Sequence, residues 1–167
     1  MGLFDRLRGR AEPPEEAGAA PRGRGEPVAD EAGSGVDAVE EVGVRRLTGE
    51  EEASLAAVRA GYAEHGIDPD DLASIAAAYD HALEHGADAN SSAVVELLGT
   101  AVGDHLVAVG GYRWVVCTDP FGTDLAVEPP RRGVPVVTRM LVAVRWVARE
   151  SGWVPGVVGH LARAGRG

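Results

Sequence analysis

Hydrophobic residues recur at helical spacing from residue 48 onward. Leu55, Val58 and Tyr62 are three or four positions apart, as on one face of an α-helix. Residues 48–51 (TGEE) precede them with the spacing of a capping box, in which threonine and glutamate cap each other's backbone amides. Gly66 can end such a helix in the left-handed conformation that glycine adopts easily. The pattern therefore predicts a helix between residues 48 and 66.

Two more helices are predicted before residue 110. Asp68 is placed to cap the second helix, Pro69 to occupy its first turn and Gly86 to stop it. Its apolar stripe consists of Leu72, Ile75, Ala76, Tyr79 and Leu83. The third helix runs from residue 91 or 92 to 109 and is apolar on more than one face, which indicates a buried central helix. Gly99 and Gly103 would let another backbone come close to it.

After Gly110 the period changes from helical to extended. Residues 112–117 (YRWVVC) are aromatic and β-branched, which is typical of a strand. Residues 119–122 (DPFG) have the residue order of a β-turn. Residues 125–127 are expected to return as the partner strand, and residues 134–137 to add a third short strand.

A fourth helix is predicted from Thr138 to about Glu150, closed by Gly152. We expect its apolar face to hold Met140, Leu141, Val144, Val147 and Ala148. The other side would carry Arg139, Arg145, Trp146 and Arg149. A last apolar segment at 153–161 is predicted as a short helix. The fold class is therefore α+β: three N-terminal helices, a β-hairpin or three-stranded antiparallel meander, then one or two C-terminal helices.

The chain before these elements has a different composition. Residues 11 to about 46 combine four prolines with many glycine, alanine and glutamate residues, and their only larger apolar side chains are valines. Such a segment buries too little surface to offset the entropy of ordering it. We therefore expect residues 1–46 to be a tail without fixed structure. Residues 47–167 would be one domain, large enough for its own core.

The stretch from about residue 97 to 161 resembles the uncharacterised bacterial family known as domain of unknown function 3806. The resemblance rests on a glycine-bearing helix, two strand segments, an acidic turn and a proline-led segment before a helix. In order, the segments are 98–103 (LGTAVG), 114–116 (WVV), 119–122 (DPFG), 124–127 (DLAV) and 134–137 (VPVV). The resemblance implies an α+β fold and a bacterial source. It implies no activity, cofactor or site residue.

The net charge of −10 is unevenly distributed. Residues 48–111 hold a single arginine, Arg59, against twelve acids, whereas residues 112–167 hold eight arginines against four acids. The acidic excess would repel a phosphate backbone, which argues against general nucleic-acid binding. The surplus charge of each half must face solvent or a partner.

Cysteine usage and hydropathy bear on the compartment. The single cysteine, Cys117, excludes an internal disulfide and a cysteine-built zinc site. No run of about 18 consecutive apolar residues is present, and residues 1–10 do not have the pattern of a signal peptide. We expect a cytoplasmic protein.

Two groups of residues could carry chemistry. His81 and His85 are four apart on the second helix and could bind one metal, with His65 as a third ligand. The alternative is that His65 and His85 only complement the dipoles of helix C-termini. Cys117 could act as a nucleophile with His105 as its base and Asp119 or Asp104 as the orienting group. The alternative is an inert cysteine in a buried strand. No complete motif is present, so we predict no catalytic residue and no cofactor.

Two surfaces could bind a partner. Arg139, Arg145, Trp146 and Arg149 could form an exposed aromatic–arginine surface of the kind found in protein interfaces. The alternative is that Trp146 packs beneath the segment around Trp153. At the N-terminus, Leu3, Phe4 and Leu7 fall on one helical face, with arginines opposite, and could touch an anionic membrane.

The leading hypothesis is a non-catalytic domain that binds another protein through the fourth helix and the hairpin. A small enzyme or metal protein using His81 and His85 is the first alternative. Peripheral membrane association through residues 1–10 is the second. The sequence leaves the oligomeric state open.

Overall fold

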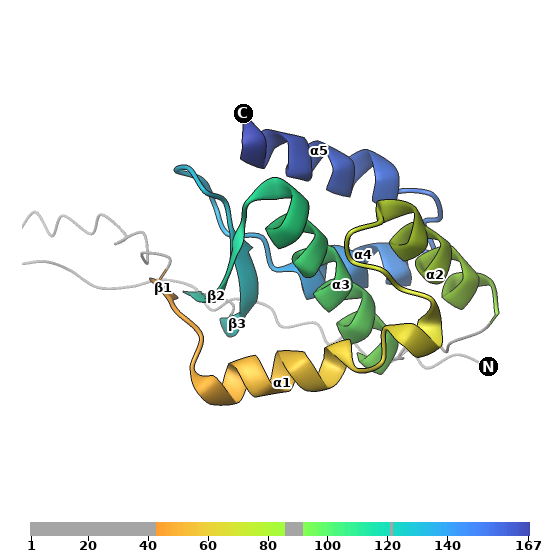
Figure 1. Cartoon of the computed structure of the whole chain (residues 1–167), viewed down its shortest axis with the longest axis horizontal. Helices are drawn as coiled ribbons and strands as arrows, with labels where there is room; N and C mark the ends of the chain where they lie inside the picture. Colours follow the sequence, from red (N-terminus) through yellow and green to blue (C-terminus); the bar gives the residue numbers. More distant parts are fainter. Residues whose placement is uncertain (1–42, 86–91, 121) are drawn as a thin grey trace, which may run out of the picture. The chain divides into compact units, whose positions relative to one another are not determined.

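The computed structural model describes residues 43–85, 92–120 and 122–167. These residues form an α+β fold, as expected, with five α-helices and a three-stranded antiparallel sheet (Figure 1). The helices are α1 (Gly49–Arg59), α2 (Leu72–Glu84), α3 (Ser92–Gly110), α4 (Thr138–Val147) and α5 (Val154–Arg166). The strands are β1 (Gly43–Arg45), β2 (Arg113–Asp119) and β3 (Gly122–Glu128).

The first helix starts where its capping signal predicts. Thr48 and Glu51 form the capping box at the start of α1, and Glu51 also binds the guanidinium of Arg45. The helix ends earlier than expected, at Arg59. A 3₁₀ helix, Ala63–His65, follows and is closed by Gly66, whose φ of 65° lies in the left-handed region.

The start of α2 corrects one prediction. Asp71, not Asp68, is the N-cap of α2, and its side chain accepts from the amide of Ala73. Asp68 instead accepts from the amide of Asp70, which keeps the residues before Asp71 in a turn. Several aspartates in one segment could each have capped the helix, and sequence alone did not distinguish them. Gly86 lies outside the described residues.

Helix α3 is the centre of the domain, as its all-round apolar pattern predicted. It contacts the other four α-helices, β2 and β3, and α1 and α5 lie on different sides of it in Figure 1. By length and composition it is the one helix in the described ranges that could span a membrane, but 61% of that window is buried inside the fold. It is therefore the core helix of this domain.

Two glycines of α3 allow close contacts. A Cβ at Gly99 would lie 2.7 Å from the Cα of Arg139, so the backbones of α3 and α4 touch there. A Cβ at Gly103 would overlap the indole ring of Trp114. The prediction that these glycines let another backbone come close is confirmed for Gly99, which contacts α4. At Gly103 the space is filled by the side chain of Trp114 instead.

The sheet has a different third strand from the one predicted. β2 lies between β1 and β3, with Val44 opposite Cys117 and Val115 opposite Ala126. Residues 134–137 contribute only an isolated bridge between Val136 and Val127. Residues 43–45 were placed in the unstructured tail, and that part of the prediction is wrong. The reason is that β1 is held by backbone hydrogen bonds to β2. A strand of three residues is too short to show the alternation of apolar and polar side chains that would predict it.

The fourth helix turns a different face to the core from the one predicted. Trp146 and Val142 are buried, at 1% and 0% exposure. Met140, Val144 and Val147 are 52%, 59% and 73% exposed. The ring of Tyr79 on α2 meets the ring of Trp146 edge-to-face, and both residues belong to the buried core together with Trp153. A large indole buries more apolar surface in this core than a valine would. The last helix, α5, was predicted as a short helix ending near residue 161, and it extends to Arg166.

Candidate functional site

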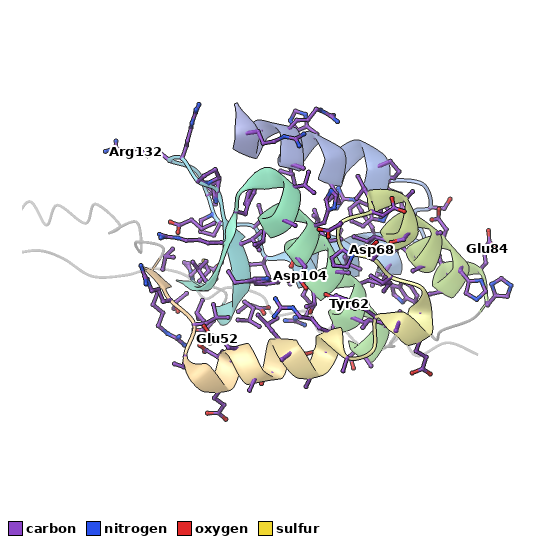
Figure 2. All side chains as sticks on the ribbon, in the orientation of Figure 1. Glu52, Tyr62, Asp68, Glu84, Asp104 and Arg132 are labelled. Atoms are coloured by element: carbon purple, nitrogen blue, oxygen red, sulfur yellow. The ribbon has the colours of Figure 1, made fainter. Side chains whose placement is uncertain are left out.

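Asp104 on α3 connects three elements through hydrogen bonds. Arg59 of α1 donates to it twice, with Nε 2.8 Å from Oδ2. The hydroxyl of Tyr62 donates to Oδ2 at 2.8 Å, and the indole Nε1 of Trp114 on β2 donates to Oδ1 at 2.9 Å. Tyr62 and Asp104 lie close together between α1 and α3 (Figure 2). We call these four residues the Asp104 network.

The network keeps Asp104 ionised. Burial opposes its ionisation, but hydrogen bonds from Arg59, Trp114 and Tyr62 outweigh that effect and lower the pKa of its carboxyl. The pKa of Tyr62 is raised by burial and by the negative charge of Asp104. Asp104 therefore acts as a fixed acceptor that holds Arg59, Tyr62 and Trp114 in place.

A cleft of about 640 Å³ opens beside this network. It lies between α1, the segment that precedes α1, and the start of β2. Three arginines from these three elements line it together with one acid, two leucines and an indole. The lining residues are Arg46, Leu47, Glu52, Leu55, Arg59, Arg113 and Trp114. We call this hollow the arginine cleft.

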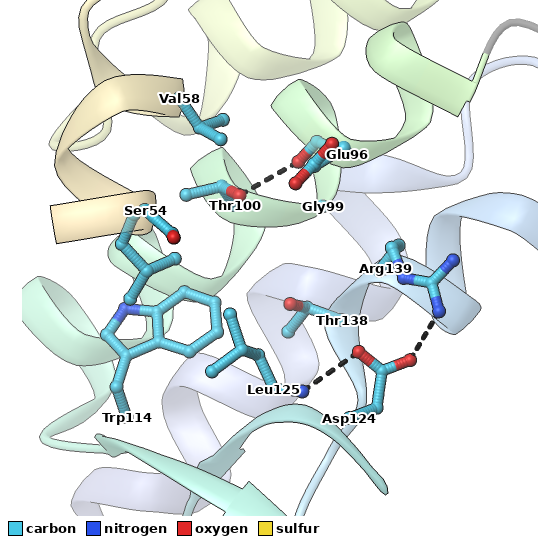
Figure 3. A pocket seen from close by; sticks show the side chains of 11 residues that line it. Ser54, Val58, Glu96, Gly99, Thr100, Trp114, Asp124, Leu125, Thr138 and Arg139 are labelled. Carbon is cyan, nitrogen blue, oxygen red and sulfur yellow. Dashed lines mark hydrogen bonds and ion pairs between the residues drawn. The ribbon is translucent and has the colours of Figure 1, made fainter. Parts of the chain in front are cut away.

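A smaller cavity of about 80 Å³ shares Leu55 and Trp114 with the arginine cleft. Figure 3 shows it between α1, α3, the hairpin and α4, with Ser54, Thr100 and Thr138 around it. On one side Arg139 binds Asp124, and the carboxylate of Asp124 also accepts from the amide of Leu125. Its volume suits a few water molecules or one side chain, not a complete drug-sized ligand.

An apolar stripe runs along the outer face of α4. Met140, Val144 and Val147 form it, and it continues into a hollow of about 340 Å³ beside the tip of the hairpin. That hollow is lined by Gly122, Thr123, Asp124, Val137, Arg139 and Met140, among others. We call the three exposed side chains the α4 stripe. Exposed apolar side chains that adjoin one another mark contact surfaces more often than scattered ones do.

A family model described as a domain of unknown function (DUF3806) matches residues 71–155. The chain belongs to this family. The match runs from the N-cap of α2 to the first turn of α5, so it includes α3, the hairpin and α4. No curated protein and no solved structure matches the chain. Since the function of the DUF3806 family is unknown, membership assigns no role to any residue.

The matched region contains the α4 stripe, Asp104 and Trp114, but not the whole arginine cleft. Arg46 and Arg59 precede residue 71 and lie outside the DUF3806 match. The cleft is therefore completed by residues that precede the matched region.

The four residues predicted as an aromatic–arginine surface do not share one surface. Trp146 is in the core, Arg139 is paired with Asp124, and Arg149 donates to the carbonyl of Leu83 at the end of α2. The guanidinium of Arg145 lies over the ring of Trp153, 4.6 Å from its centroid. The structure therefore agrees with the alternative prediction, in which Trp146 is packed beneath the segment around Trp153.

The buried aromatic residues form a second cluster within the matched region. The ring of Tyr79 meets those of Trp146 and Trp153 edge-to-face, with centroids 5.8 and 5.5 Å apart. Together with Arg145 we call them the Trp146 cluster. Within the described part of the chain, the Tyr79 hydroxyl and both indole nitrogens have no hydrogen-bond partner. The cluster is thus joined chiefly by ring packing.

The two predicted metal ligands are adjacent. The rings of His81 and His85 stack with centroids 4.2 Å apart, and Nδ1 of His85 lies 2.9 Å from the carbonyl oxygen of His81. Across residues 43–85, 92–120 and 122–167, no three His, Cys, Asp or Glu side chains are grouped to hold a metal ion. His65 does not complete a set with them. The metal hypothesis therefore gains no support and stays a prediction.

Cys117 and His105 lie in different surroundings. Cys117 is buried on β2 among Val115, Ala126 and Val137, and burial together with Asp119 raises the pKa of its thiol. A raised pKa disfavours the thiolate that a nucleophile needs. His105 is buried on α3, where its Nδ1 lies 2.8 Å from the carbonyl oxygen of Pro69. Neither residue is arranged for nucleophilic catalysis.

Leu3, Phe4 and Leu7 lie outside the described residues, so the membrane hypothesis stays a prediction. Sequence reasoning missed the Asp104 network and the arginine cleft. One signal pointed toward them: Arg59 is the single arginine in residues 48–111, a segment with twelve acids. In the structure Arg59 is paired with Asp104, one of these acids.

Proposed function

We propose that this domain binds another protein and that the α4 stripe receives an amphipathic helix of that partner. The observation that carries the proposal is the exposure of Met140, Val144 and Val147, which are 52%, 59% and 73% exposed although α4 has a fully buried opposite face. Three large apolar side chains on one stripe leave a surface that water solvates poorly.

The spacing of the stripe favours a helical partner. Its residues are four and then three positions apart, which is the spacing of the apolar seam in coiled coils. Side chains at this spacing project as knobs that fit between the side chains of a second helix. A partner helix with its own narrow apolar stripe therefore fits α4 better than a flat sheet or an extended peptide.

Polar groups border the stripe as they do in protein interfaces. Arg139 precedes Met140 and is half-exposed, and among the described residues its guanidinium is bonded through one nitrogen, to Asp124. Its remaining donors can bind carboxylates or carbonyls at the edge of a contact. An apolar centre with a polar rim is the usual anatomy of an interface. The contact surface proposed here uses the outer face of α4, so it excludes Trp146.

The test compares Val144→Asp with Ala77→Asp in the full chain. Val144 is in the stripe, whereas Ala77 is exposed on α2 and gives the same change in charge. Each protein is used to capture partners from an extract of the source organism, with a photo-crosslinking residue at Val147. We expect one partner to be captured and crosslinked by the wild type and by Ala77→Asp, and to be lost with Val144→Asp.

Two further outcomes of the same experiment would change the proposal. If Val144→Asp retains the crosslinked partner while folded, the stripe is not the contact surface. If sedimentation shows a wild-type dimer that Val144→Asp converts to a monomer, the helix on the stripe belongs to a second copy of the chain. The free energy of unfolding serves as the control, because substituting an exposed side chain should change it by less than about 0.5 kcal/mol.

A further inference from the structure

We infer that the arginine cleft binds a small organic anion that carries a phosphate or carboxylate on a planar, apolar body. The inference is independent of the α4 stripe, because it rests on a different part of the domain. It starts from the convergence of Arg46, Arg59 and Arg113 on one hollow from three separate elements.

Each of the three arginines has donors left for a ligand. Arg59 uses Nε and Nη2 to bind Asp104, and no hydrogen bond from its Nη1 is found within the described residues. Arg113 binds Glu128 through Nε, and its two terminal nitrogens make no hydrogen bond to the part of the chain that the structure describes. Arg46 makes no side-chain hydrogen bond or ion pair within the described residues. Planar guanidinium groups with free edges match the oxygen geometry of carboxylates and phosphates.

Two walls of the cleft are fixed before a ligand arrives. Asp104 binds Arg59 on one side and the indole nitrogen of Trp114 on the other, and its side chain is only 12% exposed. The same carboxylate thus fixes the positions of both the Arg59 guanidinium and the Trp114 indole ring. Groups held in this way lose little freedom when they bind, so less of the binding free energy is spent on ordering them.

The rest of the lining determines the body of the ligand. Trp114, Leu47 and Leu55 supply apolar surface, and an indole beside arginines suits a flat ring. The volume of about 640 Å³ falls in the range of pockets for small molecules. Glu52 at the edge repels excess negative charge and can accept a hydrogen bond from a ligand.

The surrounding charge favours a small anion over a polymer. The segment 48–111 holds twelve acids, and α1 alone carries Glu50, Glu51 and Glu52 in its first turn. A long phosphate backbone would pass these acids, whereas one anionic group placed between the arginines would not. The cleft is therefore a local basic site on an acidic part of the domain.

The experiment titrates the full chain with 2-naphthyl phosphate, 2-naphthoate and uncharged 2-naphthol. Binding is followed by the NMR signal of the Trp114 indole N–H, which is assigned by its loss in Trp114→Phe. We expect both anions to shift this signal saturably, and 2-naphthol to bind at least about tenfold more weakly, as for the loss of one charged hydrogen-bonded group. Added salt should weaken the binding of the anions.

Variants locate the site. Arg46→Gln should weaken the binding of both anions about tenfold. Within the described residues the Arg46 side chain makes no bond whose loss would disturb the fold. Arg113→Gln is the second variant, and Arg166→Gln, at the exposed end of α5, is the matched control that should bind like the wild type. The inference is overturned if folded protein shows no Trp114 shift up to about 10 mM probe. It is also overturned if 2-naphthol binds as tightly as the anions, or if neither cleft variant weakens binding.

Discussion

The Asp104 network and the Trp146 cluster each join three elements through tryptophan, but they differ in the hydrogen bonding of their polar groups. In the network every member is hydrogen-bonded to one carboxylate, and Trp114 remains partly exposed beside the arginine cleft. In the cluster Trp146 is 1% exposed, and its indole nitrogen has no partner among the described residues.

The difference separates stability from ligand binding within one small domain. Ring burial in the Trp146 cluster is nondirectional and holds α2, α4 and the start of α5 together. Hydrogen bonds to Asp104 are directional, and they fix Arg59 and Trp114 where a ligand could meet them. We therefore expect the cluster to dominate the free energy of unfolding and the network to determine the shape of the cleft.

The largest effect is expected at the Trp146 cluster. Trp146→Ala removes a fully buried indole and leaves a cavity, so it should lower the free energy of unfolding by about 3–5 kcal/mol. Denaturant titration followed by circular dichroism measures this change. Val147→Ala, on the exposed side of the same helix, is the control and should change it by less than about 0.5 kcal/mol. Similar losses in both variants would show that Trp146 is not a core residue.

A smaller effect is expected at the Asp104 network. Asp104→Ala leaves four donor groups on three residues without their acceptor, and the partly exposed Arg59 can recover some solvation. We expect a loss of about 2–4 kcal/mol in the free energy of unfolding. Glu128→Ala breaks a comparable pair with the exposed Arg113 and should cost less than about 1 kcal/mol. Equal costs for the two carboxylates would mean that the network is only a surface ion pair.

The smallest effect is a dependence on pH that belongs to the network alone. Because the pKa of Asp104 is lowered on folding, its contribution to stability is complete above the unfolded carboxyl value of about 3.9. That contribution is lost as the pH falls through the folded pKa. Below about pH 4 the unfolding free energy of the wild type should therefore fall more steeply than that of Asp104→Asn.

Denaturant titrations at a series of acidic pH values check this prediction. The pKa of Glu51, lowered to about 2 by Arg45 and Thr48, affects wild type and variant equally and cancels in the comparison. Trp146→Phe should keep the wild-type pH dependence, since the Trp146 cluster contains no carboxylate. Parallel curves for the wild type and Asp104→Asn would contradict the assigned role of Asp104.

The arginine cleft lay beyond sequence reasoning because its residues are far apart along the chain. Arg46, Arg59 and Arg113 line one cleft only because the fold brings α1 and the start of β2 to the same hollow. Asp104 was considered on the sequence only as an orienting group for Cys117, and nothing in the pattern joined it to Arg59. The α4 stripe was visible in the sequence as an apolar face, but it was placed in the core.

Elements whose signals are local could be predicted from the sequence. The capping box at residues 48–51, the central helix α3 and the turn between β2 and β3 each depend on neighbouring residues, and each was predicted. Tertiary structure alone decided which face of α4 is buried, because that helix is apolar on two sides. Tyr79 settles the choice, because its ring packs edge-to-face against Trp146 and also against Trp153. Which face of a helix is buried depends on the surface that packs against it, and the apolar pattern of the helix alone gives no information about that surface.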